Sequence, residues 1–232
     1  MSSQLLSRSQ VEIAPSLMCA RLDQLGDEVE RLEAAGADAL HVDIMDGHFV
    51  PNLALSPDSI AAIRSRTTLP IHAHLMVTDP CLCLAPLAAA GTDVVFFHVE
   101  AVVDAPGTAD KVSRLGMEPG LAISPHTPLP MDPDMLALSR FLVMAVEPGF
   151  AGQTWIPSSV ERVRTLRSTV GTEASIWVDG GINAETGRIL REAGADGFVG
   201  GSSSVFSASV DDYGREMAAL RLGLTAQKVA SA

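Results

Sequence analysis

The stretch of sequence that decides the fold is His41-Val42-Asp43-Ile44-Met45-Asp46-Gly47-His48-Phe49-Val50-Pro51-Asn52. Residues two apart in a strand share a face, so His41, Asp43 and Met45 point to one side. Val42 and Ile44 point to the other side, and a loop with glycine and proline follows at once. An imidazole and a carboxylate at such a strand end indicate half of a metal or acid–base site. Considered alone, the same two residues are equally well explained as a hydrogen-bonded pair at the rim of a core.

Outward from this stretch, short apolar runs alternate with longer runs that have apolar residues at helical spacing. We expect strands at residues 11–16, 40–45, 70–76, 94–99, 118–123, 140–146, 175–179 and 197–200. We expect helices at residues 22–35, 56–65, 82–90, 109–116, 134–139, 157–170, 184–193 and 210–222. The strands are continuous apolar runs, which is typical of parallel strands covered on both faces. Eight strand–helix units predict a (β/α)8 barrel.

Three joints between a helix and the next strand have similar sequences. They are Ala34-Ala35-Gly36-Ala37-Asp38, Ala89-Ala90-Gly91-Thr92-Asp93 and Glu192-Ala193-Gly194-Ala195-Asp196. In each joint we expect the glycine to end the helix and lead into the next strand. The competing architecture is an open doubly wound sheet, which normally has fewer units. No Gly-x-Gly-x-x-Gly motif follows the first strand, which also argues against that sheet.

The chain has 232 residues, of which 47% are hydrophobic and 19% are charged. This composition provides material for a sizeable core. No linker-like stretch divides the sequence, so we expect one domain over residues 11–232, preceded by a flexible tail over residues 1–10.

The net charge of −12 argues against a surface that binds nucleic acid or an anionic membrane. The cysteines are Cys19, Cys81 and Cys83, an odd number without the spacing of a disulfide framework. No targeting segment is visible, and no apolar run approaches the length that a bilayer requires. We therefore expect a cytoplasmic protein with neither nucleic acid nor membrane as a partner.

Polar residues and methionines occupy the ends of the predicted strands, which converge on one site in a barrel. These residues are Ser16, His41, Asp43, Met45, His74, Met76, Met144, Asp179, Gly201 and Ser202. Two imidazoles and two carboxylates among them match the ligand set of a divalent metal of intermediate softness. Each residue alone could be an ordinary polar residue at a strand end, but the four together favour a metal site.

Glycine-rich loops follow the last three predicted strands, at residues 146–153, 179–183 and 200–204. Glycine lets the backbone approach a ligand closely and aim N–H groups at it. The last loops of a barrel are the usual phosphate site of this fold. Turns need glycine in any case, but glycines after three successive strands favour a phosphorylated ligand.

Four motifs, in this order, resemble those of ribulose-phosphate 3-epimerases. They are residues 42–52 (VDIMDGHFVPN), 74–76 (HLM), 148–153 (PGFAGQ) and 178–181 (VDGG). The resemblance extends from about Ile13 to Phe206. It implies a single (β/α)8 TIM barrel of the ribulose-phosphate-binding type, one divalent metal ion (zinc, iron, manganese or cobalt), a phosphorylated ketose substrate and a homo-oligomer.

The resemblance also implies roles for individual residues. The implied metal ligands are His41, Asp43, His74 and Asp179, and Asp43 and Asp179 are also the implied acid–base pair. Ser16 and His74 correspond to substrate contacts. The implied phosphate cradle consists of Gly149, Phe150, Ala151, Gly152, Gly180, Gly181, Gly201 and Ser202. Met45, Met76 and Met144 correspond to methionines that line the site.

The implied reaction removes the proton on C3 of a 2-ketose and returns it to the opposite face. The intermediate is an enediolate, whose charge a metal ion would stabilise. Two carboxylates on opposite faces can act as base and acid and exchange these roles with direction.

Two substrates stay open. Glu147 stands where common pentulose-phosphate epimerases carry asparagine, and residues 15–19 (PSLMC), 52–57 and 74–78 look more like the D-allulose-6-phosphate 3-epimerase branch. The loop after the eighth strand is also longer, as in that branch, whereas residues 179–181 (DGG) have the commoner epimerase form. The reaction is thus either D-ribulose 5-phosphate to D-xylulose 5-phosphate or D-allulose 6-phosphate to D-fructose 6-phosphate.

Two other functions use the same scaffold. Sugar-phosphate decarboxylases and aldol-type enzymes typically carry a lysine in an Asp-x-Lys-x-x-Asp string, and residues 43–46 (DIMD) contain none. A non-catalytic phosphosugar-binding barrel would be expected to lose a proton-transfer carboxylate, and both are present. His72 and His98 lie on predicted strands, and we expect each to belong to the core or to support the site from behind.

Overall fold

The computed structural model describes residues 11–226, so the tail predicted at residues 1–10 lies outside the described residues. Its strands are β1 (Glu12–Pro15), β2 (Leu40–Met45), β3 (Ile71–Met76), β4 (Val94–His98), β5 (Glu118–Ile123), β6 (Arg140–Met144), β7 (Ser175–Asp179) and β8 (Gly197–Gly200). Its helices are α1 (Leu25–Ala34), α2 (Pro57–Arg64), α3 (Cys81–Ala90), α4 (Ala105–Arg114), α5 (Pro133–Leu136), α6 (Ser159–Val170), α7 (Ala184–Ala193) and α8 (Tyr213–Thr225). Short 3-10 turns are η1 (Leu17–Cys19), η2 (Leu22–Gln24), η3 (Val99–Ala101) and η4 (Val210–Asp212).

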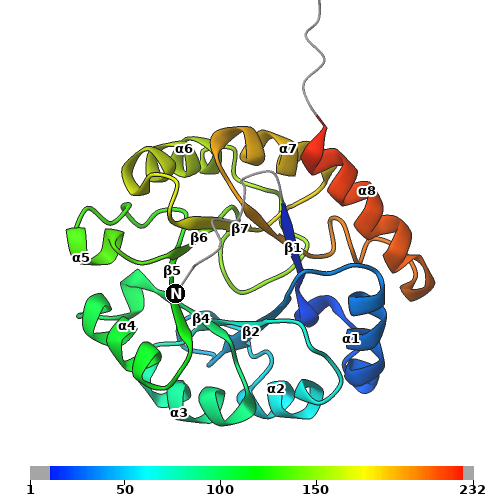
Figure 1. Ribbon diagram of the computed structural model, residues 1–232, viewed down its shortest axis with the longest axis horizontal. Coiled ribbons are helices and arrows are strands. Elements are labelled where there is room, and N and C mark those ends of the chain that lie inside the picture. Colours follow the sequence, from blue (N-terminus) through cyan, green and yellow to red (C-terminus); the bar gives the residue numbers. More distant parts are fainter. Residues whose placement is uncertain (1–10, 227–232) are drawn as a thin grey trace, which may run out of the picture.

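The strands form one parallel sheet in the order β1-β8-β7-β6-β5-β4-β3-β2. A parallel bridge between Ser16 and His41 joins the two ends of this sheet and brings β1 beside β2. Figure 1 shows the strands inside a ring of helices. The predicted single (β/α)8 barrel is confirmed, and the open doubly wound sheet is excluded because the sheet turns back on itself.

The core has two layers because strand residues alternate between the inside of the barrel and the helices around it. Inside the barrel lie Phe96, Leu142, Met144 and Trp177 among other buried side chains. The outer layer is larger and packs the sheet against the apolar stripes of the helices. Burial on both faces explains why the strands read as continuous apolar runs.

The predicted elements are all present, and the differences lie at their ends. Helix α4 begins at Ala105 rather than at 109, because the carboxylate of Asp104 accepts a hydrogen bond from the backbone N–H of Gly107 and caps the helix there. The helices predicted from residues 22 and 210 each begin as a 3-10 turn, η2 and η4, before α1 and α8 follow. Such changes of one helical turn do not alter which face is buried.

The three similar joints end their helices as predicted. Gly36, Gly91 and Gly194 have φ angles of 89°, 85° and 116°, the left-handed region in which a side chain is strained. The chain therefore turns at the same point in all three units and enters the following strand.

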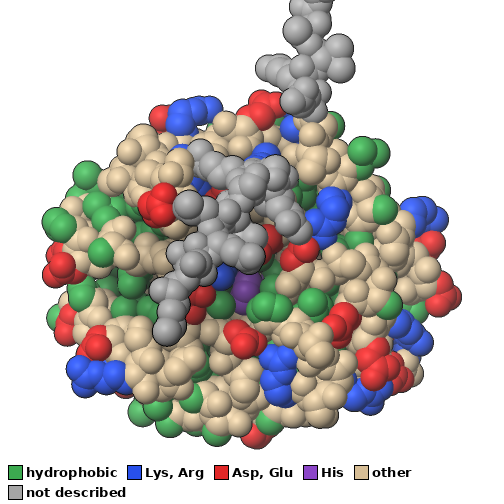
Figure 2. Space-filling model, viewed as in Figure 1, with side chains coloured by type: hydrophobic (Ala, Val, Ile, Leu, Met, Phe, Trp, Pro, Cys, Tyr) green, Lys and Arg blue, Asp and Glu red, His purple; other side chains and the backbone are tan. Residues whose placement is uncertain are grey.

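Figure 2 shows one face of the molecule, on which Lys and Arg side chains lie among acidic ones around the rim. Within residues 11–226, no helix has the length and apolar character needed to cross a membrane.

Candidate active site

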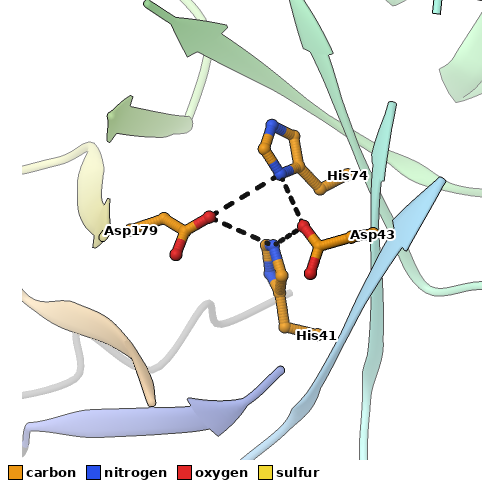
Figure 3. A group of neighbouring side chains, drawn as sticks. All are labelled: His41, Asp43, His74 and Asp179. Carbon is orange, nitrogen blue, oxygen red and sulfur yellow. Dashed lines mark hydrogen bonds and ion pairs between the residues drawn. The ribbon is translucent and has the colours of Figure 1, made fainter. Parts of the chain in front are cut away.

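Four polar side chains from three strands meet at one end of the barrel. His41 and Asp43 stand two residues apart on β2, and the strand register places Asp43 directly beside His74 of β3. Asp179 is the last residue of β7 and reaches the group from the opposite side (Figure 3). The structure thus brings together the residues that the sequence singled out for a metal site.

The donor atoms of these four residues all lie within 4.8 Å of one another. Oδ1 of Asp43 is 3.3 Å from Nε2 of His41 and 3.0 Å from Nδ1 of His74. Oδ2 of Asp179 is 3.9 Å and 3.8 Å from the same two nitrogens. Ligands at about 2.1 Å from one ion are separated by about 3.0–3.4 Å at octahedral or tetrahedral angles. The group could therefore hold a metal ion after small side-chain movements.

His41 provides a direct test of this fit. The residue is completely buried, yet neither of its ring nitrogens makes a hydrogen bond within residues 11–226. Its Nε2 faces Asp43 without the alignment of a hydrogen bond. Leaving a buried nitrogen without a partner costs free energy. A cation at the centre of the group would give this nitrogen a partner, so the residues present fit a metal ion.

The two carboxyl groups differ in acidity. Burial alone would raise the pKa of Asp43, but His41 and His74 beside it hold that pKa well below its usual range. Burial and the negative charge of Asp43 raise the pKa of Asp179 to about 7. Burial also lowers the pKa of His74 to about 4, so this imidazole is neutral and can act as a ligand. Asp43 is therefore the anion of the pair, and Asp179 is the group that holds a proton more readily.

Ser16 and Cys19 flank the carboxylates at the end of β1. The hydroxyl of Ser16 donates a hydrogen bond of 2.6 Å to Oδ2 of Asp43, which leaves Oδ1 directed at the two histidines. Burial raises the pKa of the Cys19 thiol to about 11, so at neutral pH it is not a thiolate nucleophile. The chemistry at this end of the barrel therefore depends on carboxylates and imidazoles.

A cavity opens above the four residues. Among the predicted site residues, those that line it are Ser16, Asp43, Met45, Met76, Met144, Gly149, Phe150, Ala151, Gly152, Asp179, Gly180, Gly181, Gly201 and Ser202. His41 and His74 do not line the cavity, since both are completely buried beneath it. Met45 and Met76 pack together with Val50, and Met144 belongs to the barrel interior. These methionines form an apolar wall next to the carboxylates.

Several residues that line the cavity were not predicted as individual site residues. They are Met18, Cys19, Val146, Glu147, Pro148, Gln153, Ile182, Val199 and Ser203. Six of the nine lie in the predicted glycine-rich loops at residues 146–153, 179–183 and 200–204, so loop membership was the available signal. Among the described residues that line the cavity there is no lysine or arginine. Any phosphate here would be bound by backbone N–H groups and hydroxyls.

The glycine-rich loops are held in defined conformations. Gly180 and Gly181 have φ angles of 113° and 64°. A Cβ atom at Gly181 would lie 2.6 Å from Cβ of Trp155, so only glycine fits. The side-chain amide of Gln153 donates to the carbonyl oxygens of Glu147 and Phe150 and closes the loop after β6 on itself. The glycines of these loops border the cavity and expose their backbone to it.

Comparison with known proteins identifies the family. The model of the ribulose-phosphate 3 epimerase family matches residues 12–206. A ribulose-phosphate 3-epimerase from Mycobacterium bovis is 42% identical over 213 residues, which cover 90% of this chain and 91% of the relative. The enzyme of that name from Chlamydia muridarum is 40% identical over 203 residues, covering 85% of this chain and 89% of the relative.

Solved structures show the same fold at low sequence identity. An orotidine 5'-phosphate decarboxylase from Pyrococcus horikoshii OT3 has a TM-score of 0.66 at 16% identity, covering 93% of this chain and 100% of that one. This likeness concerns the fold alone. The family match over residues 12–206 and the relatives at 40% identity and above show that the chain belongs to the ribulose-phosphate 3-epimerase family.

Proposed function

We propose that this protein is a metal-dependent ketose-phosphate 3-epimerase that interconverts D-ribulose 5-phosphate and D-xylulose 5-phosphate. The observation that carries the proposal is the pair of carboxylates from β2 and β7 facing one another across two buried imidazoles (Figure 3). Epimerisation at C3 needs one group on each face of the substrate, one to remove a proton and one to return it. Asp43 and Asp179 are the two groups that meet this requirement.

The different acidities of the two carboxyls fit this division of roles. Asp43 is held as the anion by its histidine neighbours and can accept a proton. Without a cation, burial and the negative charge of Asp43 raise the pKa of Asp179 to about 7, so Asp179 holds a proton more readily than Asp43 does. Removal of the C3 proton next to the C2 carbonyl gives an enediolate, and protonation from the other face inverts C3. In the reverse reaction the two residues exchange their roles.

His41, Asp43, His74 and Asp179 are the residues that would hold a divalent cation such as zinc, iron, manganese or cobalt. When bound, this cation supplies positive charge that stabilises the negative charge developing on the C2 and C3 oxygens. Ser16 fixes the orientation of Asp43 through its hydrogen bond. Met45, Met76 and Met144 exclude water from the reacting carbon, which strengthens the electrostatic interactions around it.

The phosphate end of the substrate is assigned to the glycine-rich loops after β6, β7 and β8. The assigned residues are Gly149, Phe150, Ala151, Gly152, Gly180, Gly181, Gly201 and Ser202. Glycines allow close approach of backbone N–H groups, and Ser202 adds a hydroxyl donor. This assignment suits a cavity whose described lining has no basic side chain, because oriented N–H groups bind phosphate without a formal positive charge.

D-allulose 6-phosphate, with D-fructose 6-phosphate as the product, is the second candidate substrate. The resemblance of residues 15–19 and of the longer loop after β8 to the allulose branch favours it. The relatives named as ribulose-phosphate 3-epimerases favour the pentulose, which is why we place it first. A decarboxylase or aldolase lacks support, since no lysine lines the described cavity.

The test is hydrogen–deuterium exchange at C3, followed by NMR in heavy water with D-ribulose 5-phosphate and D-allulose 6-phosphate. Each substrate is assayed before and after removal of metal by a chelator. We expect fast exchange that is lost with the metal and that is much faster for the pentulose. Faster exchange with the hexulose would move the assignment to the second candidate. A folded, metal-loaded protein that exchanges neither substrate would contradict the epimerase.

We also infer that the protein forms a homo-oligomer in the cytoplasm. Large apolar side chains, among them Leu53, Leu82 and Leu222, are exposed on a single copy of the chain. Contacts between subunits would remove apolar side chains such as these from water. Analytical ultracentrifugation of the purified protein tests the oligomer, and a monomer would contradict it. Fractionation of the source cells tests the location, and an exported protein would contradict it.

A further inference from the structure

A chain of buried polar contacts leads away from the proposed metal site. Nε2 of His74 lies 2.9 Å from Nε2 of His98, and the two rings are stacked with their centroids 5.1 Å apart. On the far side of that ring, Nδ1 of His98 lies 2.9 Å from Oε1 of Glu100. His74 and His98 are completely buried. The proposed ligand His74 is thus joined through His98 to a carboxylate outside the four-residue group.

Binding of a cation at Nδ1 of His74 gives each atom in this chain one role. An imidazole that binds a cation through Nδ1 carries its hydrogen on Nε2, so Nε2 of His74 donates to Nε2 of His98. His98 then carries its own hydrogen on Nδ1 and donates it to Glu100, because a carboxylate can only accept. Without a cation, the carboxylate of Asp43 accepts a hydrogen bond from Nδ1 of His74 instead. The nitrogen of His74 that would bind the cation is Nδ1. That is the nitrogen 3.0 Å from Asp43 and 3.8 Å from Asp179.

Neighbouring groups keep Glu100 ionised and in place. Burial would raise its pKa, but hydrogen bonds from His98 and from the hydroxyl of Ser124 lower the pKa to about 2. The guanidinium of Arg162 donates to the carbonyl oxygens of Ser124 and Thr127 and fixes the loop that carries this hydroxyl. The carboxylate is thus an acceptor under all ordinary conditions.

We propose that Glu100 and His98 are positioning residues: His98 accepts the Nε2 hydrogen of His74 and so stabilises the tautomer whose Nδ1 binds the metal. The proposal rests on the metal site of the proposed function. Partners of this kind behind a ligating histidine typically contribute about 10- to 100-fold to metal affinity. Glu100 and His98 would therefore act on the reaction without touching the substrate.

The first measurement is the tautomer of each histidine in the full-length protein labelled with 15N-histidine and loaded with Zn2+. Two-bond proton–nitrogen NMR distinguishes a protonated Nδ1 from a protonated Nε2, and single substitutions assign the six histidines. We expect His98 to be protonated on Nδ1, with its Nε2 free to accept from His74. A His98 protonated on Nε2 would overturn the proposal.

The second measurement is the affinity for Co2+, read from its visible absorption, in variants of the same chain. His98→Leu removes the acceptor and is expected to weaken binding about 10- to 100-fold, and Glu100→Gln about 10-fold. His98→Gln keeps an amide oxygen that can accept from His74, so its affinity is expected to recover to within about threefold of the wild type. Tyr213→Phe is the control, because it removes a buried hydrogen bond to Glu28 far from the site and should leave Co2+ affinity unchanged.

The outcomes separate the two proposals. Wild-type affinity in folded Glu100→Gln would overturn the positioning role, and so would wild-type affinity in a folded His98→Leu variant. Equal weakening in Tyr213→Phe would also overturn it, because the effect would then follow from lost stability. A wild-type protein that binds no Co2+ would overturn the proposed metal site itself, and the positioning role with it.

Discussion

Asp43 and Asp179 carry the same functional group in different surroundings, and both are proposed to transfer protons. Replacing either carboxylate with an amide keeps its size and removes the proton acceptor. We expect Asp43→Asn and Asp179→Asn each to lower turnover at least about 100-fold, the usual contribution of a general acid or base. Turnover is measured with D-ribulose 5-phosphate, and bound metal is measured in parallel by elemental analysis.

Asp110 provides the matched control for these two variants, because it is an exposed aspartate on α4 whose partner is Arg114. Asp110→Asn should keep wild-type turnover. Near-wild-type activity in Asp43→Asn or Asp179→Asn, with metal still bound, would remove that residue from the proton-transfer pair.

Glu100 makes a second prediction at this scale, which concerns acid stability. Its pKa falls from 4.5 in the unfolded chain to about 2 in the folded protein. A depressed carboxyl pKa stabilises the fold above the unfolded pKa, and this stabilisation is lost as the pH falls from about 4.5 towards 2. The stability difference between wild type and Glu100→Gln should therefore narrow by about 1 kcal/mol between about pH 6 and pH 3.5. Urea unfolding of the metal-free proteins measures it, and a constant difference would contradict the ionised contact with His98.

At the scale of elements, three of the eight strand–helix units contain the same polar contact at the start of the strands. Asp38, Asp93 and Asp196 each accept the backbone N–H of a neighbouring strand, from Ile13, Ile71 and Ile176 respectively. Each aspartate also pairs with an arginine from a helix, Arg221, Arg64 and Arg167. Each arginine in turn donates to the carbonyl of the glycine that ends a helix, Gly36, Gly91 and Gly194.

This contact gives the three similar joints in the sequence a physical purpose. The glycine ends the helix and exposes its carbonyl oxygen, and the aspartate two residues later binds the edge of the preceding strand. The arginine connects the glycine and the aspartate to another helix. In the joint at Gly36 that helix is α8, which lies far away along the chain. Local sequence therefore fixes the turn, whereas the arginine joins separate elements.

Arg221 tests the contribution of this contact to stability. Its guanidinium donates to the carbonyl oxygens of Val11 and Gly36 and pairs with Asp38. We expect Arg221→Met to lower the free energy of unfolding by about 1–3 kcal/mol, because it leaves partly buried acceptors without a donor. Arg188→Met is the control, since it removes only a surface pair with Glu192 and should cost less than about 0.5 kcal/mol. Equal values in urea unfolding would show that the contact of α8 with the segments before β1 and β2 adds nothing.

At the scale of the whole molecule, a metal ion would connect strands that are far apart in the sequence. The four proposed ligands come from β2, β3 and β7, so the unfolded chain cannot bind the ion in the same way. At a metal concentration about 100-fold above the dissociation constant, binding adds about 2.7 kcal/mol to stability. For a domain of this size we expect the melting temperature to fall by about 5–10 °C when a chelator removes the metal. Calorimetry checks this, and His41→Gln should show a much smaller fall; an equal fall would place the stabilising ion elsewhere.

The sequence by itself determined the order of the elements, the barrel and the family. Apolar runs separated by amphipathic segments are local patterns, and the motifs from Val42 to Gly181 are local strings. The helix starts were less accurate, as at Ala105, because a cap such as Asp104 competes with other polar residues of the same loop. The joint glycines were predicted well, since only glycine adopts their φ angles without strain.

Only the tertiary structure decided which polar groups touch. His98 and Glu100 gave no sequence signal beyond a histidine on a strand, and their contact with His74 depends on how β3 lies beside β4. Arg221 lies 183 residues from Asp38, so no local pattern could pair them. The unequal acidities of Asp43 and Asp179 likewise depend on burial and on neighbours from other strands. Hydrogen bonds and charges act through space, so they become readable only once the closed barrel has brought distant residues together.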